Sequence, residues 1–135
     1  MIVGSGIDVI EISRVARALA RHRDRFAVRV FTDRERADCA GFGRPAPHFA
    51  LRFAAKEAVM KAVGTGWAHG VRWVDIEVVR EPRSMAVALR LHGRVAEIAA
   101  RRGASYLHLA LSRSRTHAVA IVLCEGCSPP GRPAT

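Results

Sequence analysis

Lysine is nearly absent from this 135-residue chain, although its formal net charge is +10. Of the 22 basic residues only Lys56 and Lys61 are lysines, and both lie in one segment. Either this bias is chance, or the two positions require a compact ammonium group rather than the planar fork of arginine. A chain this basic favours an acidic partner, such as nucleic acid, an anionic membrane, a phosphate-rich ligand or an acidic protein.

Cysteines, aromatic residues and long apolar runs are also scarce. The three cysteines cannot form a complete disulfide framework, and Cys124 and Cys127 lack the second pair that a zinc site would need. The apolar runs are too short for a membrane span, and the first residues lack the basic region of a secretory signal, so we expect a cytoplasmic protein. Eight aromatic residues, not interleaved with basic ones, do not favour a nucleic-acid stacking platform.

Hydrophobic periodicity predicts a single α+β domain over residues 1–125, followed by a disordered tail over residues 126–135. The order of the elements favours a mainly antiparallel sheet packed against helices. Strands are predicted at 2–12, 74–80, 85–91, 105–112 and 116–124, and helices at 14–22, 33–40, 46–63 and 93–103.

Three helix ends carry recognisable signals. Ser13 is a candidate N-cap of the first helix, and Thr32 followed by Glu35 is a capping-box pattern at the start of the second. Gly64 follows the helix predicted at 46–63, where a glycine is expected to end it.

Charged residues stand in apolar surroundings at two places. Asp8 shares the even face of the first strand with isoleucines, and a carboxylate in such company needs a hydrogen-bonded partner, a cation or a metal. The helix at 46–63 is apolar on most sides and is therefore predicted to be buried. Its charges are either two ordinary helix ion pairs or parts of a site, and they are Arg52, Lys56, Glu57 and Lys61.

Three segments form a pattern specific enough to indicate a family. They are the strand GIDVIEI, the helix RFAAKEAVMKAVGTG and the strand HLALS, in this order. Together they resemble the small holo-acyl-carrier-protein synthases of the 4′-phosphopantetheinyl transferase superfamily. The resemblance implies a cytoplasmic homotrimer with active sites between subunits. It also implies a Mg²⁺-dependent enzyme of lipid biosynthesis that moves the 4′-phosphopantetheine arm of coenzyme A onto a serine of an acyl carrier protein and releases 3′,5′-ADP.

The resemblance assigns roles to individual residues. Asp8 and Glu57 match the metal carboxylates, in keeping with the oxygen ligands that Mg²⁺ prefers. Lys61 matches the lysine at the coenzyme A diphosphate and completes the expected catalytic set. Either Glu57 or a water beside the metal would take the serine proton. Further contacts to coenzyme A are implied for Arg52, Lys56, Gly64, Thr65, Gly66, Ser112 and Arg113.

One residue departs from the family pattern, since Arg113 stands where a histidine is usual. An arginine can bind a phosphate through two hydrogen bonds, but it does not titrate near neutral pH. His108 and His117 flank this position at offsets that do not replace the missing imidazole, and we interpret them as ordinary strand histidines.

The helix at 14–22 carries a basic face formed by Arg14, Arg17 and Arg21. The resemblance implies that an acidic carrier protein docks there, whereas the alternative is a merely solvated surface. Two other functions compete with the enzyme. A catalytically silent trimer that binds coenzyme A is compatible with Arg113. A basic nucleic-acid-binding domain explains the charge but not Asp8 and Glu57, which would repel phosphates in the absence of a metal.

Overall fold

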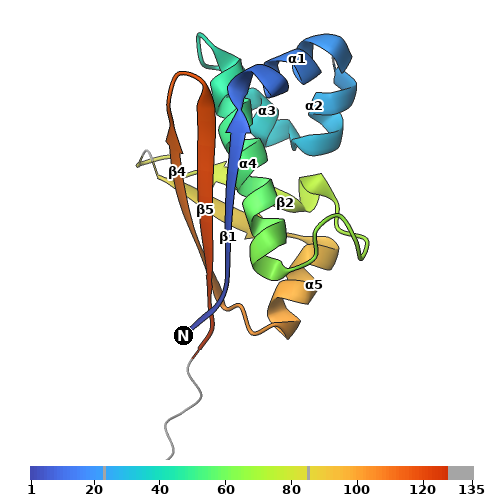
Figure 1. The fold of residues 1–135 in the computed structure, drawn as a ribbon, viewed down its shortest axis with the longest axis vertical. Coiled ribbons are helices and arrows are strands. Elements are labelled where there is room, and N and C mark those ends of the chain that lie inside the picture. Colours follow the sequence, from blue (N-terminus) through green and yellow to red (C-terminus); the bar gives the residue numbers. More distant parts are fainter. Residues whose placement is uncertain (23, 85, 128–135) are drawn as a thin grey trace, which may run out of the picture.

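An antiparallel sheet of three strands and a long helix packed against it form the centre of the fold (Figure 1). The structure is a computed structural model and describes residues 1–22, 24–84 and 86–127. Its elements are β1 (Ile2–Glu11), α1 (Ile12–His22), α2 (Asp24–Val30), α3 (Asp33–Ala40), α4 (Pro45–Val63), β2 (Ile76–Arg80), β3 (Val87–Leu91), α5 (Gly93–Arg101), β4 (Tyr106–Arg113) and β5 (His117–Glu125).

The strands form two antiparallel sheets, which confirms the predicted α+β class. The larger has the order β1-β5-β4, so β1 is an edge strand, and the smaller pairs β2 with β3. Residues directly opposite each other in the larger sheet include Asp8 with Ala120 and Ser112 with Val119. Successive side chains along a strand point to opposite faces, so this register decides which residues meet α4 and which face away from it.

Two glycines allow β1 to approach α4 at backbone distance. A Cβ atom on Gly4 would lie 2.3 Å from the carbonyl oxygen of Ala62, and one on Gly6 would lie 2.1 Å from that of Ala58. Real Cβ atoms essentially never come this close, so both positions require glycine. The same strand face carries Asp8 two residues later, which places its carboxylate against the helix.

Helix α4 is buried on most sides, as predicted from its composition. Its alanines at 50, 54, 55 and 58 have no exposed surface, and neither does Val59. The helix ends where expected, because Gly64 takes the left-handed conformation with φ 77° and donates its N–H to the carbonyl of Met60. The predicted capping box at the start of α3 is also present, with Thr32 and Glu35 bonded reciprocally.

Three sequence predictions need correction. Helix α1 begins at Ile12 directly after β1, so Ser13 lies within it rather than capping it. Helix α2 was not predicted at all. The strand predicted at 74–80 starts later, because Trp73–Asp75 form a 3₁₀ turn. Of the tail predicted at 126–135, residues 128–135 lie outside the described residues.

Within the described ranges, no helix combines the length and hydrophobicity needed to cross a membrane. The cysteines are free thiols, of which Cys39 and Cys124 are buried and Cys127 is exposed.

Candidate active site

A pocket of about 440 Å³ lies where β1, α1, α4 and the loop after α4 meet. Two carboxylates, Asp8 and Glu57, line it together with Arg14 of α1. The structure thus brings the two predicted metal carboxylates, 49 positions apart in the sequence, to one cavity.

Asp8 is held by Lys61. The Lys61 ammonium donates to Asp8 Oδ1 at 2.9 Å and to the carbonyl oxygen of Ile7 at the same distance. The Asp8 side chain is 15% exposed, whereas that of Lys61 is 52% exposed. The lysine can therefore reach toward a ligand at the surface while it neutralises a carboxylate that is nearly buried.

Glu57 lies beside this pair and has an unusual protonation equilibrium. Burial raises the pKa of Glu57, the negative charge of Asp8 raises it further, and the positive charge of Lys61 opposes both. A divalent cation bound at this pocket wall would favour the ionised form of Glu57 and would interact with both carboxylates. The donor set therefore fits Mg²⁺, which commonly takes one or two protein carboxylates and completes its shell with water and phosphate oxygens.

Aromatic side chains form the apolar wall of the same pocket. Phe26 of α2, Phe53 of α4 and Trp67 of the following loop line it. The Phe26 and Phe53 rings lie 6.2 Å apart, and Trp67 stands edge-on to buried Trp73 at 4.3 Å. Sequence reasoning missed this wall, because Phe26 belongs to the unpredicted α2 and Trp67 lies in a glycine-rich loop.

A second group of predicted residues gathers near the N-terminal half of α4. The pKa of His48 is lowered, first by burial and then by the positive charges of Arg113, Arg52 and Arg80. Arg52 is buried and donates to the His48 carbonyl at 3.3 Å, and its Nε has no hydrogen-bond partner among the described residues. Converging arginines and a buried donor without a partner fit an anionic ligand.

The remaining predicted residues have more varied surroundings. The Gly64 and Thr65 N–H groups both bond to the Met60 carbonyl, so the end of α4 uses two donors of the predicted phosphate loop. Gly66 also has a left-handed conformation, with φ 53°. Ser112 is exposed on the sheet face that points away from α4, one residue before Arg113, which follows it on the inner side.

Lys56 does not reach a surface on which coenzyme A could lie. Its side chain has no exposed area, and its ammonium bonds to Glu35 Oε1 at 2.7 Å. The burial of Lys56 does not fit the phosphate contact expected from the sequence. It results from a partner 21 residues away that no local pattern identified.

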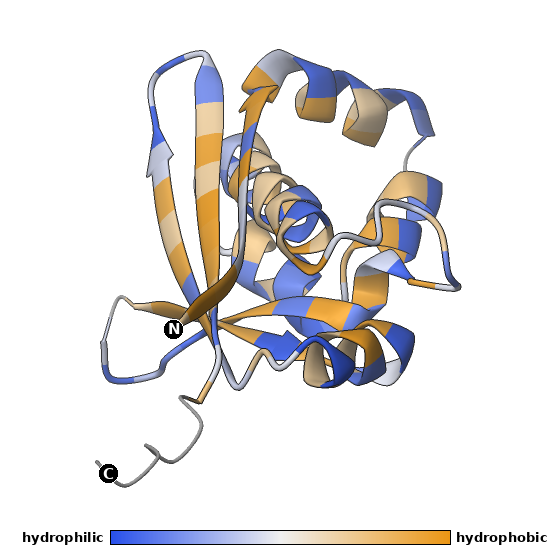
Figure 2. Ribbon diagram, turned by 60° about the horizontal axis from the view of Figure 1, so that its bottom comes forward, coloured by the Kyte–Doolittle hydropathy of each residue, from blue (hydrophilic) through white to orange (hydrophobic). Residues whose placement is uncertain are grey.

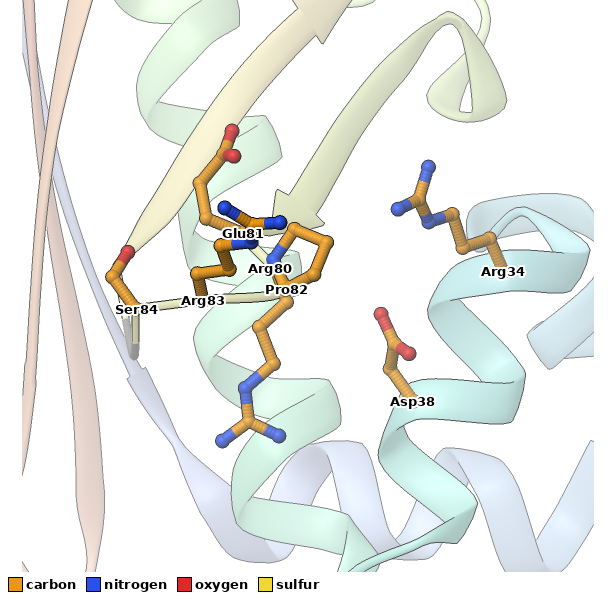
Figure 3. A pocket seen from close by; sticks show the side chains of 7 residues that line it. All are labelled: Arg34, Asp38, Arg80, Glu81, Pro82, Arg83 and Ser84. Carbon is orange, nitrogen blue, oxygen red and sulfur yellow. The ribbon is translucent and has the colours of Figure 1, made fainter.

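A second, slightly larger pocket of about 500 Å³ lies between α3 and the connection from β2 to β3 (Figure 3). Three arginines and two carboxylates line it, with Pro82 and Ser84: Arg34, Arg80, Arg83, Asp38 and Glu81. None of the residues predicted for catalysis lines this pocket. The two carboxylates predicted to hold a metal instead line the smaller pocket.

Known proteins match almost the whole chain. The model of the 4′-phosphopantetheinyl transferase superfamily matches residues 4–122. The chain belongs to this superfamily. A protein of Alkalilimnicola ehrlichii named holo-[acyl-carrier-protein] synthase is 46% identical over 126 residues, which cover 93% of this chain and 98% of that protein.

Solved structures of superfamily members share the fold. The holo-[acyl-carrier-protein] synthase of Neisseria meningitidis aligns with a TM-score of 0.83 and 30% identity, covering 93% of this chain and 99% of that one. The Bacillus anthracis enzyme, solved in complex with coenzyme A (3′,5′-ADP), aligns with a TM-score of 0.76 and 38% identity, covering 94% and 99%.

Proposed function

We propose that the chain is a holo-[acyl-carrier-protein] synthase, which transfers 4′-phosphopantetheine from coenzyme A to a serine of an apo acyl carrier protein and releases 3′,5′-ADP. The observation that carries the proposal is the pocket in which Asp8 and Glu57 lie together with Lys61 bonded to Asp8. The names of the relatives agree with it.

Asp8 and Glu57 would hold Mg²⁺, which neutralises charge on the phosphates when bound. The protein's own part is to present two carboxylates on rigid elements, one on a strand and one on a helix packed against it. Transfer of this kind relies mainly on positioning and charge stabilisation. Lys61, half-exposed beside Asp8, supplies an ammonium for the diphosphate, and Arg52 with Arg113 supplies guanidinium groups for a more distant phosphate.

We further propose that the enzyme is a homotrimer, as the family resemblance implies. No helix covers the sheet face away from α4 (Figure 2). Its exposed hydrophobic residues, each between 37% and 62% exposed, are Val3, Ile7, Val9, Tyr106, Ile121 and Leu123. Clusters of exposed hydrophobic residues commonly mark protein–protein contact sites. Ser112 lies on the same face, so a neighbouring subunit could bring it to the site.

Light scattering tests this assembly. A mass of three chains, each 14.7 kDa, is expected in solution. A monomer that is stable at micromolar concentration would contradict the trimer.

The carrier protein is proposed to dock on α1. Arg14, Arg17 and Arg21 are all exposed, and Arg14 also lines the pocket. An acidic carrier bound there would present its serine close to Asp8 and Glu57, and opposite charges would accelerate encounter. We also propose that the enzyme is cytoplasmic, as the family resemblance implies.

Chromatographic measurement of 3′,5′-ADP tests the function. Release is expected only when coenzyme A, apo carrier protein and Mg²⁺ are all present, and it should be lost in Asp8→Asn. A silent coenzyme A-binding protein would bind coenzyme A yet release nothing, and that outcome would refute the proposal.

A further inference from the structure

Lys56 and Glu35 form a fully buried ion pair that the proposed reaction does not use. Neither side chain has any exposed area, and their charged atoms are 2.7 Å apart. The Lys56 ammonium donates a second hydrogen bond, at 3.0 Å, to the carbonyl oxygen of Trp73, and it lies 5.4 Å from the centroid of the Phe31 ring. Burial lowers the pKa of Lys56, and the charge and hydrogen bond of Glu35 oppose this effect.

Backbone N–H groups at the start of its own helix and in β2 hold Glu35 in place. Its Oε1 also accepts the N–H of Thr32 at 3.0 Å, within the capping box of α3. Its Oε2 accepts the N–H of Val78 in β2 at 3.2 Å. Glu35 thus has a position defined by α3 and β2, and Lys56 ties α4 to that position.

This tie has consequences for the active site because Lys56 immediately precedes Glu57. Consecutive helical residues are about 100° apart around the axis, so the direction of Lys56 fixes the direction of Glu57. The Trp73 carbonyl extends the tie to the pocket wall, because the Trp73 ring stacks on Phe53 at 4.9 Å and meets Trp67 at 4.3 Å.

Stability alone is a weak reason for such a pair. Two buried charges cost so much desolvation that a hydrophobic pair of similar volume often stabilises a protein as well or better. Each oxygen of Glu35 nevertheless has a partner, and the pair joins α3 and β2 to α4. An arrangement of this kind defines geometry, and the geometry it defines here is the rotation of α4.

We infer that the Lys56–Glu35 pair is a positioning device for the proposed transfer: it sets the rotation of α4 so that Glu57 faces Asp8, and Lys56 does not contact substrate. The inference rests on the proposed function for its kinetic consequences. Its effect on the metal carboxylates can be measured separately.

The decisive variant is the double replacement Glu35→Gln/Lys56→Met, which removes both charges and keeps similar side-chain sizes. A matched control is Glu97→Gln/Arg94→Met, which removes an exposed ion pair of α5. For both proteins we would measure the thermal unfolding midpoint, the binding of Mn²⁺ by its electron paramagnetic resonance signal, kcat, and the KM for coenzyme A.

We expect the decisive variant to unfold within a few degrees of wild type, whereas Lys56→Met alone, which leaves Glu35 buried without its cation, should unfold much earlier. Mn²⁺ binding should weaken by about tenfold and kcat should fall by a similar factor, as when residues that orient metal ligands are removed. The KM for coenzyme A should stay within about twofold, since uniform substrate binding is not altered. The control should match wild type.

Two results would overturn the inference. Wild-type Mn²⁺ binding and kcat in the decisive variant would make the pair merely structural. A KM for coenzyme A raised about tenfold with Mn²⁺ binding intact would make Lys56 a substrate ligand. If the double variant does not fold, Glu35→Asp keeps the charge but shortens the side chain, and unaltered Mn²⁺ binding there would equally refute the device. If the wild-type protein transfers no phosphopantetheine, only the proposed function is refuted. The role of the Lys56–Glu35 pair is still tested by comparing Mn²⁺ binding in the wild type and in the double variant.

Discussion

Replacement of Gly6 by alanine should separate β1 from α4 and disable the site without touching a functional side chain. The added Cβ would lie 2.1 Å from the Ala58 carbonyl oxygen and 2.8 Å from the Ala62 nitrogen. These are backbone atoms in the middle of a helix, so neither can rotate away. The strand must therefore move outward by about 1 Å to restore an ordinary contact distance.

That displacement has an energetic and a catalytic cost. Overpacking a well-filled contact typically destabilises a protein by about 1–3 kcal/mol. Asp8 lies two residues further on the same strand face and would move with it, away from the Lys61 ammonium that is now 2.9 Å away. A misplacement of about 1 Å can cost roughly a hundredfold in rate, so kcat should fall by about this factor.

The assay compares Gly6→Ala with Gly43→Ala in denaturant unfolding and in steady-state transfer. Gly43 is the matched control, because a Cβ there meets nothing within 4 Å. A Gly6→Ala protein whose kcat lies within about twofold of the control would refute the argument that backbone contact between β1 and α4 positions the site.

Three further predictions follow from charges at the site. Lys61→Met should bind Mg²⁺ several-fold more tightly in calorimetric titration, because the ammonium no longer competes for Asp8, while transfer is lost; unchanged Mg²⁺ affinity would contradict this. In metal-free protein the raised pKa of Glu57 gives a stability contribution that is present below its ordinary value of 4.5 and lost as the pH rises through the folded value. At pH 7 the Glu57→Gln variant should therefore have a higher melting temperature than the wild type. If the two proteins melt at the same temperature at pH 7 as well as at pH 4, the assigned cause is contradicted. The three exposed arginines of α1 are Arg14, Arg17 and Arg21. Replacing all three by alanine should raise the KM for carrier protein by about tenfold at low salt and by less at high salt. A KM that does not depend on salt would exclude this docking face.

Local signals explain why parts of the fold could be predicted. The capping box of α3 and the glycine after α4 act through neighbouring residues, so the sequence contains all the information they need. Helix α2 has only seven residues, which is too short a span for a hydrophobic period to stand out in the sequence. Helix α1 begins at Ile12, whose N–H bonds to the Thr116 carbonyl at 2.8 Å, a tertiary contact that no local sequence signal identifies.

The sequence likewise identified some residues of the site correctly and misjudged the surroundings of others. Asp8, Glu57 and Lys61 could be predicted as a group because unusual polarity and a family pattern marked them. Lys56 has the same unusual polarity and lies in the same family pattern. Its surroundings, however, depend on Glu35 of a different helix. Sequence spacing suggested a partner on the same helix, but a partner fixed by tertiary packing leaves no periodic signal.

Intact-mass spectrometry of an apo acyl carrier protein tests the central claim most directly. The carrier would be incubated with the protein, coenzyme A and Mg²⁺, with a parallel sample in EDTA. We predict the gain of one phosphopantetheine group, absent in EDTA and absent for a carrier whose acceptor serine is replaced by alanine. An unmodified carrier, from several sources and with folded, coenzyme A-bound protein, would contradict the account.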